Sequence, residues 1–190
     1  MSEASDSLQI KTDDADACIV KLRESGFNGL VFQGDRGWLT VVPYGSPGEV
    51  LMLMEDRIES LARMLGAPVV NYVRSEDFGW SFALVLPDGR WTSFECCWDP
   101  FLDEAHVPDA DSNAGVDEGV LAEVVSVERI RPFLGPPVPP AGETGAAKDF
   151  AREMGFPQFE WLSPAYVLSD PEDAVRRGGE EIGNRPVRPS

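Results

Sequence analysis

Apolar residues recur with helical spacing in three parts of the chain. Residues 15–22, 58–65 and 147–154 each carry apolar side chains at positions i, i+3, i+4 and i+7, which form one face of an α-helix. A glycine follows each segment, namely Gly26, Gly66 and Gly155. Because glycine readily takes the left-handed conformation that ends a helix, this pattern predicts three helices that stop at these glycines.

Strand-like sequence follows the first two predicted helices, and polar turns separate its segments. These segments are residues 30–32, 38–42, 69–73, 80–86 and 91–98. After each of the two helices, the second strand-like segment starts at a tryptophan that follows a glycine, namely Gly37-Trp38 and Gly79-Trp80. We interpret residues 9–98 as two related helix-plus-meander units that share one antiparallel sheet, which implies an internal duplication.

The last of these segments alternates between two kinds of side chain. Thr92, Phe94, Cys96 and Trp98 fall on one face of the strand, and Trp91, Ser93, Glu95 and Cys97 fall on the other. The first face is apolar and is predicted to be buried, whereas Trp91 on the polar face is predicted to be partly exposed. Cys96 and Cys97 point in opposite directions, so they do not form a chelating pair.

The predicted fold class is α+β, with an antiparallel sheet of five or six strands and two or three helices packed on one face. A single domain is expected over residues 1–168. Within it, residues 99–119 form an acidic loop and residues 135–146 a proline- and glycine-rich linker. Residues 147–168 are predicted to hold the third helix and a strand-like segment, and residues 169–190 a disordered tail.

Acidity is the strongest bulk property of the chain. Its 33 Asp and Glu outnumber 16 Lys and Arg, which gives a net charge of −17. The excess is densest in residues 101–118, which hold six acids and no base. Such a field repels phosphate, so direct nucleic-acid binding is not expected. It also speeds encounter with a basic protein, which we take as the expected partner, although acidity alone also keeps proteins soluble.

The expected location is the cytoplasm. The amino terminus lacks the basic and apolar regions of a secretory signal. The longest apolar run, residues 50–54, is too short to span a bilayer, so no membrane association is expected. Three cysteines do not make the paired framework of a disulfide-rich secreted domain. The oligomeric state is left open.

Catalytic and metal-binding patterns are weak in this sequence. The one histidine, His106, has no adjacent nucleophile, and the four zinc ligands of paired spacing are missing. A calcium loop starting at Asp109 fails at its glycine and closing glutamate positions, which are Ala114 and Val120. No phosphate-binding glycine motif occurs. We therefore expect no catalytic residue, no metal and no cofactor.

The leading hypothesis is a non-catalytic protein that binds a basic protein, similar in character to bacterial immunity proteins or antitoxins that inhibit a basic toxin or effector. Tryptophans would anchor the contact and acids would steer it. The candidate partner-binding residues are Trp91, Glu95, Asp103, Glu104, Asp109, Asp111, Asp117, Glu118 and Trp161. Two alternatives stay open: a nucleic-acid mimic that occupies a DNA-binding protein, and a small enzyme or ligand binder with a carboxylate-lined cleft.

Overall fold

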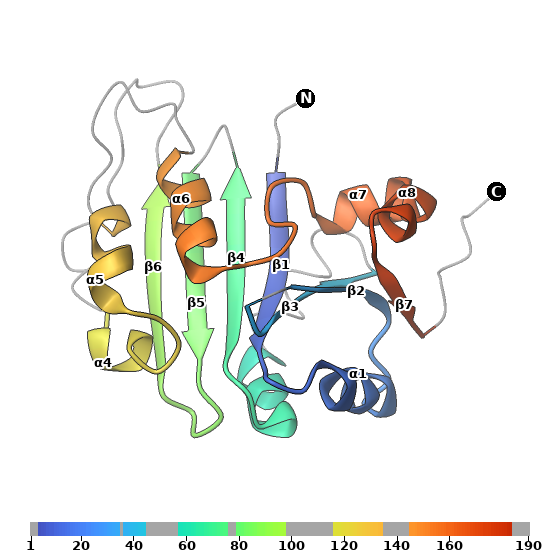
Figure 1. Cartoon of the computed structure of the whole chain (residues 1–190), viewed down its shortest axis with the longest axis horizontal. Helices are drawn as coiled ribbons and strands as arrows, with labels where there is room; N and C mark the ends of the chain where they lie inside the picture. The colour runs from blue at the N-terminus through green and yellow to red at the C-terminus, as the bar shows by residue number, and fades with distance from the viewer. Residues whose placement is uncertain are drawn as a thin grey trace.

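A computed structural model describes residues 4–34, 36–44, 57–75, 79–97, 116–134 and 145–183. In this part of the chain seven strands form one antiparallel sheet of order β6-β5-β4-β1-β3-β2-β7, with helices beside it (Figure 1). The α+β class and the antiparallel sheet are confirmed. The sheet has seven strands, whereas the sequence predicts five or six.

The strands are β1 (Ala4–Lys11), β2 (Gly29–Gln33), β3 (Trp38–Pro43), β4 (Val69–Ser75), β5 (Gly79–Val85), β6 (Trp91–Cys97) and β7 (Glu180–Ile182). The helices are α1 (Ala15–Glu24), α4 (Glu118–Leu121), α5 (Val127–Ile130), the 3-10 helix η1 (Arg131–Phe133), α6 (Gly145–Met154), α7 (Pro164–Ser169) and α8 (Pro171–Arg176). Residues 57–65 are helical as well.

The amino-terminal strand β1 lies at the centre of the sheet, where it pairs with β3 and β4. Leu8 stands opposite Val41 of β3 and Asn71 of β4. The two predicted units are therefore not adjacent in the sheet, because β1 separates β3 from β4. The structure does not confirm an internal duplication.

Helices cover both faces of the sheet, which corrects the prediction of helices on one face. α1 and residues 57–65 pack against one face through Leu22 and Ala62. The second face, which we call the α4–α8 face, packs against α4, α5, α6, α7 and α8. The reason lies in β2 and β3: every residue of β3 is buried, as are the first four of β2. Strands buried on both faces need cover on both.

Aromatic rings fill the core of the α4–α8 face. Phe150 of α6 is fully buried and lies 4.8 Å from Phe82 and 5.1 Å from Trp80, measured between ring centroids. The opposite core is aliphatic and includes Leu8 and Ile10 of β1. Thus the alternation predicted for β6, with Phe94 and Cys96 inward, is confirmed.

The predicted helix ends are confirmed. Gly26, Gly66 and Gly155 have φ values of 77°, 68° and 85°, in the left-handed region. At Gly66 and Gly155 the amide N–H donates to the carbonyl of Ala62 and of Ala151, four residues earlier. These bonds satisfy carbonyls that the ending helix leaves without a partner.

The carboxyl-terminal region differs from its prediction. Residues 158–163 form turns and α7 follows them, where a strand-like segment was expected. Residues 169–183, assigned above to a disordered tail, contain α8 and the strand β7. Both are short: α8 begins at Pro171 with the Asp170 side chain as its N-cap, and Ile182 of β7 is buried against the sheet. Short elements carry too few residues for a periodic signal.

Most of the predicted acidic loop and linker lies outside the described residues, since residues 98–115 and 135–144 are not among them. Within the described ranges, none of the helices has both the length and the apolar character needed to cross a bilayer.

Candidate functional site

Trp91 and Glu95 lie on the face of the sheet opposite the α4–α8 face. Trp91 begins the edge strand β6 and leaves 62% of its surface exposed, the largest exposed fraction of any large apolar side chain in the described residues. Glu95, two pleats along the same face, is also exposed. The predicted partial exposure of Trp91 is confirmed.

Asp117 and Glu118 both have structural partners. Asp117 caps α4, because its Oδ1 accepts hydrogen bonds from the backbone N–H groups of Gly119 and Val120 at 2.8 and 3.2 Å. Glu118 accepts two bonds from the guanidinium of Arg131, at 3.0 and 2.8 Å. These carboxylates hold α4 and η1 in place on the α4–α8 face.

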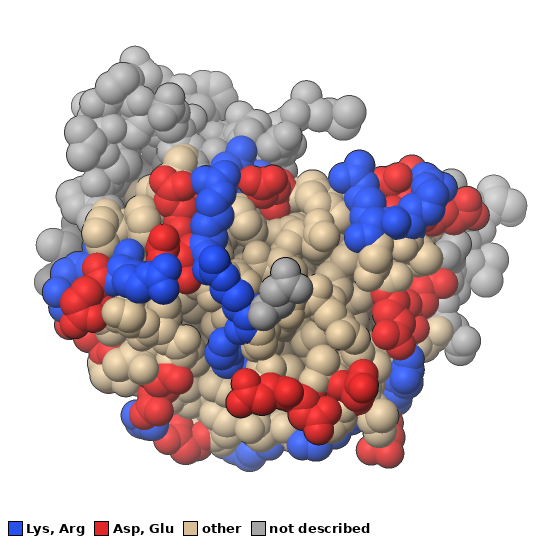
Figure 2. Space-filling model, in the orientation of Figure 1, with Lys and Arg blue, Asp and Glu red and all other residues tan. Residues whose placement is uncertain are grey.

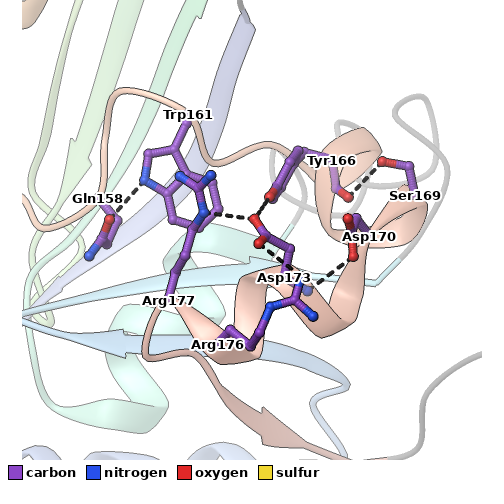
Figure 3. A network of polar contacts seen from close by, with 8 residues as sticks. All are labelled: Gln158, Trp161, Tyr166, Ser169, Asp170, Asp173, Arg176 and Arg177. Carbon is purple, nitrogen blue, oxygen red and sulfur yellow. Dashed lines mark hydrogen bonds and ion pairs between the residues drawn. The ribbon is translucent and has the colours of Figure 1, made fainter.

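Trp161 is packed into the structure, in contrast with Trp91. Its ring is partly buried and meets Phe32 and Tyr166 edge-on, at 5.8 and 5.0 Å between centroids. Its Nε1–H donates to Gln158 at 2.8 Å, and the guanidinium of Arg177 lies 4.6 Å from the ring centroid (Figure 3). Because Phe32 belongs to the α4–α8 face, the two tryptophans lie on opposite sides of the sheet.

The sequence-predicted set therefore does not form one surface. Four of its members, Asp103, Glu104, Asp109 and Asp111, lie outside the described residues, as does His106. The other five are divided between the two sides of the sheet.

The described cysteines are separated as well. Cys18 of α1 and Cys96 of β6 are buried in different cores, on opposite faces of the sheet. Burial raises the pKa of the Cys18 thiol to about 11 and also raises that of Cys96, which disfavours the reactive thiolate. No group of three or more His, Cys, Asp or Glu side chains in the described ranges is arranged to hold a metal ion.

A hollow of about 320 Å³ lies beside Trp91. We call it the Trp91 hollow. Its lining includes Ile58, Asn71, Ala83, Val85, Gly89 and Trp91. The sheet register brings these residues together, because Asn71 pairs with Ala83 and Val85 pairs with Trp91. Ala83 of β5 and Ser93 of β6 are paired neighbours on the same face of the sheet, and their side chains are small.

The turn between β5 and β6 fixes the position of Trp91. Gly89 has a φ of 88°, which the tight turn requires and which side chains rarely adopt. The Arg90 backbone N–H and guanidinium both donate to Asp88, at 3.0 and 2.8 Å, and these bonds lower the pKa of the Asp88 carboxyl. Arg90 also reaches Glu123 at 3.1 Å, which ties the turn to the segment after α4.

Two polar residues line the Trp91 hollow. One is Asn71, whose side-chain oxygen is buried without a hydrogen-bond partner among the described residues and is not exposed to the hollow. The Glu59 carboxylate lines the rim, where it accepts from Arg63 at 2.5 Å. An aromatic face and a carboxylate together suit a guanidinium or ammonium group.

Sequence reasoning found Trp91 and Glu95 by alternation but missed Asn71, Glu59 and Gly89. Asn71 interrupts an apolar strand, which was a usable signal for a polar residue in the sheet. Asn71 lies 20 residues before Trp91 in the sequence, so only the order of the strands in the sheet shows that the two residues line the same hollow.

Comparison of the chain with models of protein families, with curated proteins and with solved structures found no match.

Proposed function

We propose that this protein is a non-catalytic binding protein whose partner is a basic protein, and that a Lys or Arg side chain of the partner enters the Trp91 hollow. The observation that carries the proposal is the 62% exposure of Trp91 on a sheet edge, beside the carboxylate of Glu59 in the lining of the Trp91 hollow. An exposed tryptophan next to a hollow of side-chain size has the character of a binding hot spot.

Charge supports a basic partner over an acidic one. The chain carries a net charge of −17, which attracts a basic surface over a distance set by the ionic strength. Four carboxylates belong to this region. Glu59 lines the hollow, Asp88 lies in the turn before Trp91, and Glu95 lies on β6. The fourth is Glu123, which accepts a hydrogen bond from Arg90 of the turn. Three of them pair with two arginines: Glu59 with Arg63, and Asp88 and Glu123 with Arg90.

In its most specific form the proposal is an immunity or antitoxin function: the protein would bind and inhibit a basic toxin or effector made by the same cell. The predicted acids of residues 103–111 would then steer the encounter. This specific form requires that the protein inhibits an activity of its partner as well as binding it.

The nucleic-acid mimic hypothesis receives less support. Carboxylates on the α4–α8 face are interspersed with arginines, as in the pairs Arg152 with Asp149 and Arg131 with Glu118. Figure 2 shows Lys and Arg side chains forming a band across this face, between groups of Asp and Glu. A mimic needs an uninterrupted row of carboxylates to replace phosphates.

The proposal can be tested by photo-crosslinking in the source cell. A benzophenone amino acid at Ser93, beside Trp91, is expected to crosslink one basic protein, and the same group at Val20 of α1, which is 47% exposed, is expected not to. The gene next to that of this chain supplies the first candidate for reconstitution with purified proteins.

With the purified partner, Trp91→Ser is expected to weaken binding more than about 30-fold, as loss of a hot-spot residue does. Val175→Ser, which removes another exposed apolar side chain, serves as the control and is expected to have no effect. Raising the salt concentration from about 50 to 500 mM should weaken binding further. A crosslinked partner that is acidic, or binding that Trp91→Ser leaves unchanged, would refute the proposal.

A further inference from the structure

A second hollow lies on the other side of residues 57–65. It occupies about 510 Å³ between these residues, the turn after α1 and the end of β3. We call it the Leu8 groove, since Leu8 of the central strand contributes to its lining. Ile58 lines both this groove and the Trp91 hollow, so the helical residues 57–65 separate the two.

The lining of the Leu8 groove is mainly apolar. Its apolar side chains are those of Leu8, Phe27, Pro43, Ile58, Leu61 and Met64. Met64 is 39% exposed, although methionine is an apolar side chain that proteins usually bury. A concave apolar surface of this volume falls within the range of small-molecule sites, about 300 to 1,000 Å³.

Among the described lining residues of the Leu8 groove, the charge is opposite to that of the chain. None of its described lining residues is acidic, although the chain holds 33 Asp and Glu. The one charged residue in this lining is Arg57, whose guanidinium forms no ion pair within the described ranges. By contrast, Arg63 of the same helical segment pairs with Glu59.

We infer that the Leu8 groove binds a small amphipathic anion, with an apolar body against Leu8, Phe27 and Leu61 and a carboxylate that pairs with Arg57. Arginine forms charge-assisted bonds with carboxylates, and these are stronger than bonds between neutral groups. Each methylene group buried in the groove raises affinity about fourfold. This site is independent of the proposed protein-binding function.

Three compounds that share a chain of ten carbons but differ in head group test both halves of this inference by titration calorimetry on the full chain. Decanoate is expected to bind, whereas decanol and decyltrimethylammonium are expected to bind at least about tenfold more weakly, because neither pairs with a guanidinium. Octanoate should bind about 15-fold more weakly than decanoate, since it buries two fewer methylenes. Equal affinity for decanol and decanoate overturns the role of Arg57.

Variants locate the site. Arg57→Gln is expected to reduce decanoate affinity about tenfold and to leave decanol binding unchanged, and the matched control Arg63→Gln is expected to change neither. Ser60→Trp places a large ring in the groove lining and should abolish binding of decanoate, whereas Arg63→Trp on the same helical segment should not.

Circular dichroism checks that each variant keeps its fold. Failure of the folded wild-type chain to bind decanoate, or unchanged binding in folded Ser60→Trp, overturns the site. Because Trp91 does not line the Leu8 groove, Trp91→Ser should leave decanoate binding intact, which separates this test from that of the proposed function.

Discussion

The hydroxyl of Thr40 in β3 donates to the side-chain oxygen of Gln9 in the central strand β1 at 2.7 Å, and both residues are fully buried. The Gln9 amide in turn donates to the hydroxyl of Ser7 at 2.8 Å. Ser5, one pleat further along β1, donates to the carbonyl of Leu162 at 2.9 Å. A row of buried polar residues thus runs along β1 between the two apolar clusters of the α4–α8 face.

The segment between α6 and α7 covers this polar row with its backbone. The Leu162 carbonyl accepts from Ser5 at 2.9 Å, and the Pro157 carbonyl lies 2.5 Å from the Thr40 hydroxyl, whose single proton it shares with Gln9. Gln158 has a φ of 55°, the one positive value among the described residues other than glycine. Such a conformation is held by its surroundings, and here Trp161 donates to the Gln158 side chain while the neighbouring Pro157 carbonyl is in contact with Thr40 of the polar row.

Thr40→Val is expected to destabilise the fold by about 1 to 3 kcal/mol, because it removes the donor and leaves the buried oxygen of Gln9 unpaired. In the double variant Thr40→Val with Gln9→Met, both partners are apolar, so the loss should be smaller than the sum of the two single losses. Urea denaturation measures all three free energies of unfolding. Strictly additive losses would show that the two side chains do not interact.

The same polar row explains why sequence analysis missed the central strand. The period of two in β1 is present, with Leu8 and Ile10 on one face, but Ser5, Ser7 and Gln9 on the other resemble a solvated surface. Alternation of apolar and polar residues along a strand predicts that the polar face is exposed to solvent. Here Thr40 of β3 donates to Gln9, Gln9 donates to Ser7, and Ser5 donates to the carbonyl of Leu162, 157 residues later, and no local pattern contains these partners.

Phe150→Ala is expected to cost about 3 to 5 kcal/mol, since it leaves a cavity among rings that include Trp80, Phe82 and Phe156. Trp91→Ala should change stability by no more than about 0.5 kcal/mol, because that side chain is largely exposed. Both values can be read from urea denaturation curves. A large loss for Trp91→Ala would mean that Trp91 is a structural residue, and it would remove the basis for a binding site there.

Only part of the candidate site could be predicted from the sequence. Alternation along β6 was enough to separate the exposed Trp91 from the buried Phe94, because the two faces differ in their apolar content. It could not separate Trp91 from Trp161, since both stand among polar and acidic neighbours in sequence. Trp161 is covered by Phe32, Tyr166 and Arg177, and these contacts depend on tertiary packing.

Asp173→Asn is expected to lower the melting temperature at pH 7. The Asp173 carboxylate accepts from Tyr166, from Arg176 at 3.0 Å and from Arg177 at 2.7 Å, and these bonds lower its pKa to about 2 (Figure 3). A lowered pKa stabilises the fold above the unfolded value of 3.8, and this stabilisation is lost as the pH falls towards 2.

The difference in melting temperature between wild type and Asp173→Asn should therefore shrink as the pH falls from 4 to about 2. Glu172→Gln, on the same helix, removes an exposed carboxylate and serves as the control. A difference that stays constant across this range would mean that the charge of Asp173 does not contribute to stability.

Asp6 presents the opposite case. It lies on β1 with the apolar face of Leu8 and Ile10, and its Oδ1 is buried without a hydrogen-bond partner in the described residues. Burial raises its pKa from 3.8 to about 6. The folded chain therefore holds this proton at pH 5, where the unfolded chain has released it, so stability falls as the pH rises from about 4 to 6 and stays reduced above that.

Asp6→Asn removes this titration and should be more stable than the wild type at pH 7.5, by up to about 3 kcal/mol for a shift of two pKa units. The advantage should disappear near pH 4, where the wild-type carboxyl is neutral as well. Asp16→Asn on α1 is the control for loss of an exposed charge, and urea denaturation at both pH values measures the effect. An advantage that does not depend on pH would mean that Asp6 titrates alike in the folded and unfolded chains, so that the unpaired oxygen would carry no electrostatic cost.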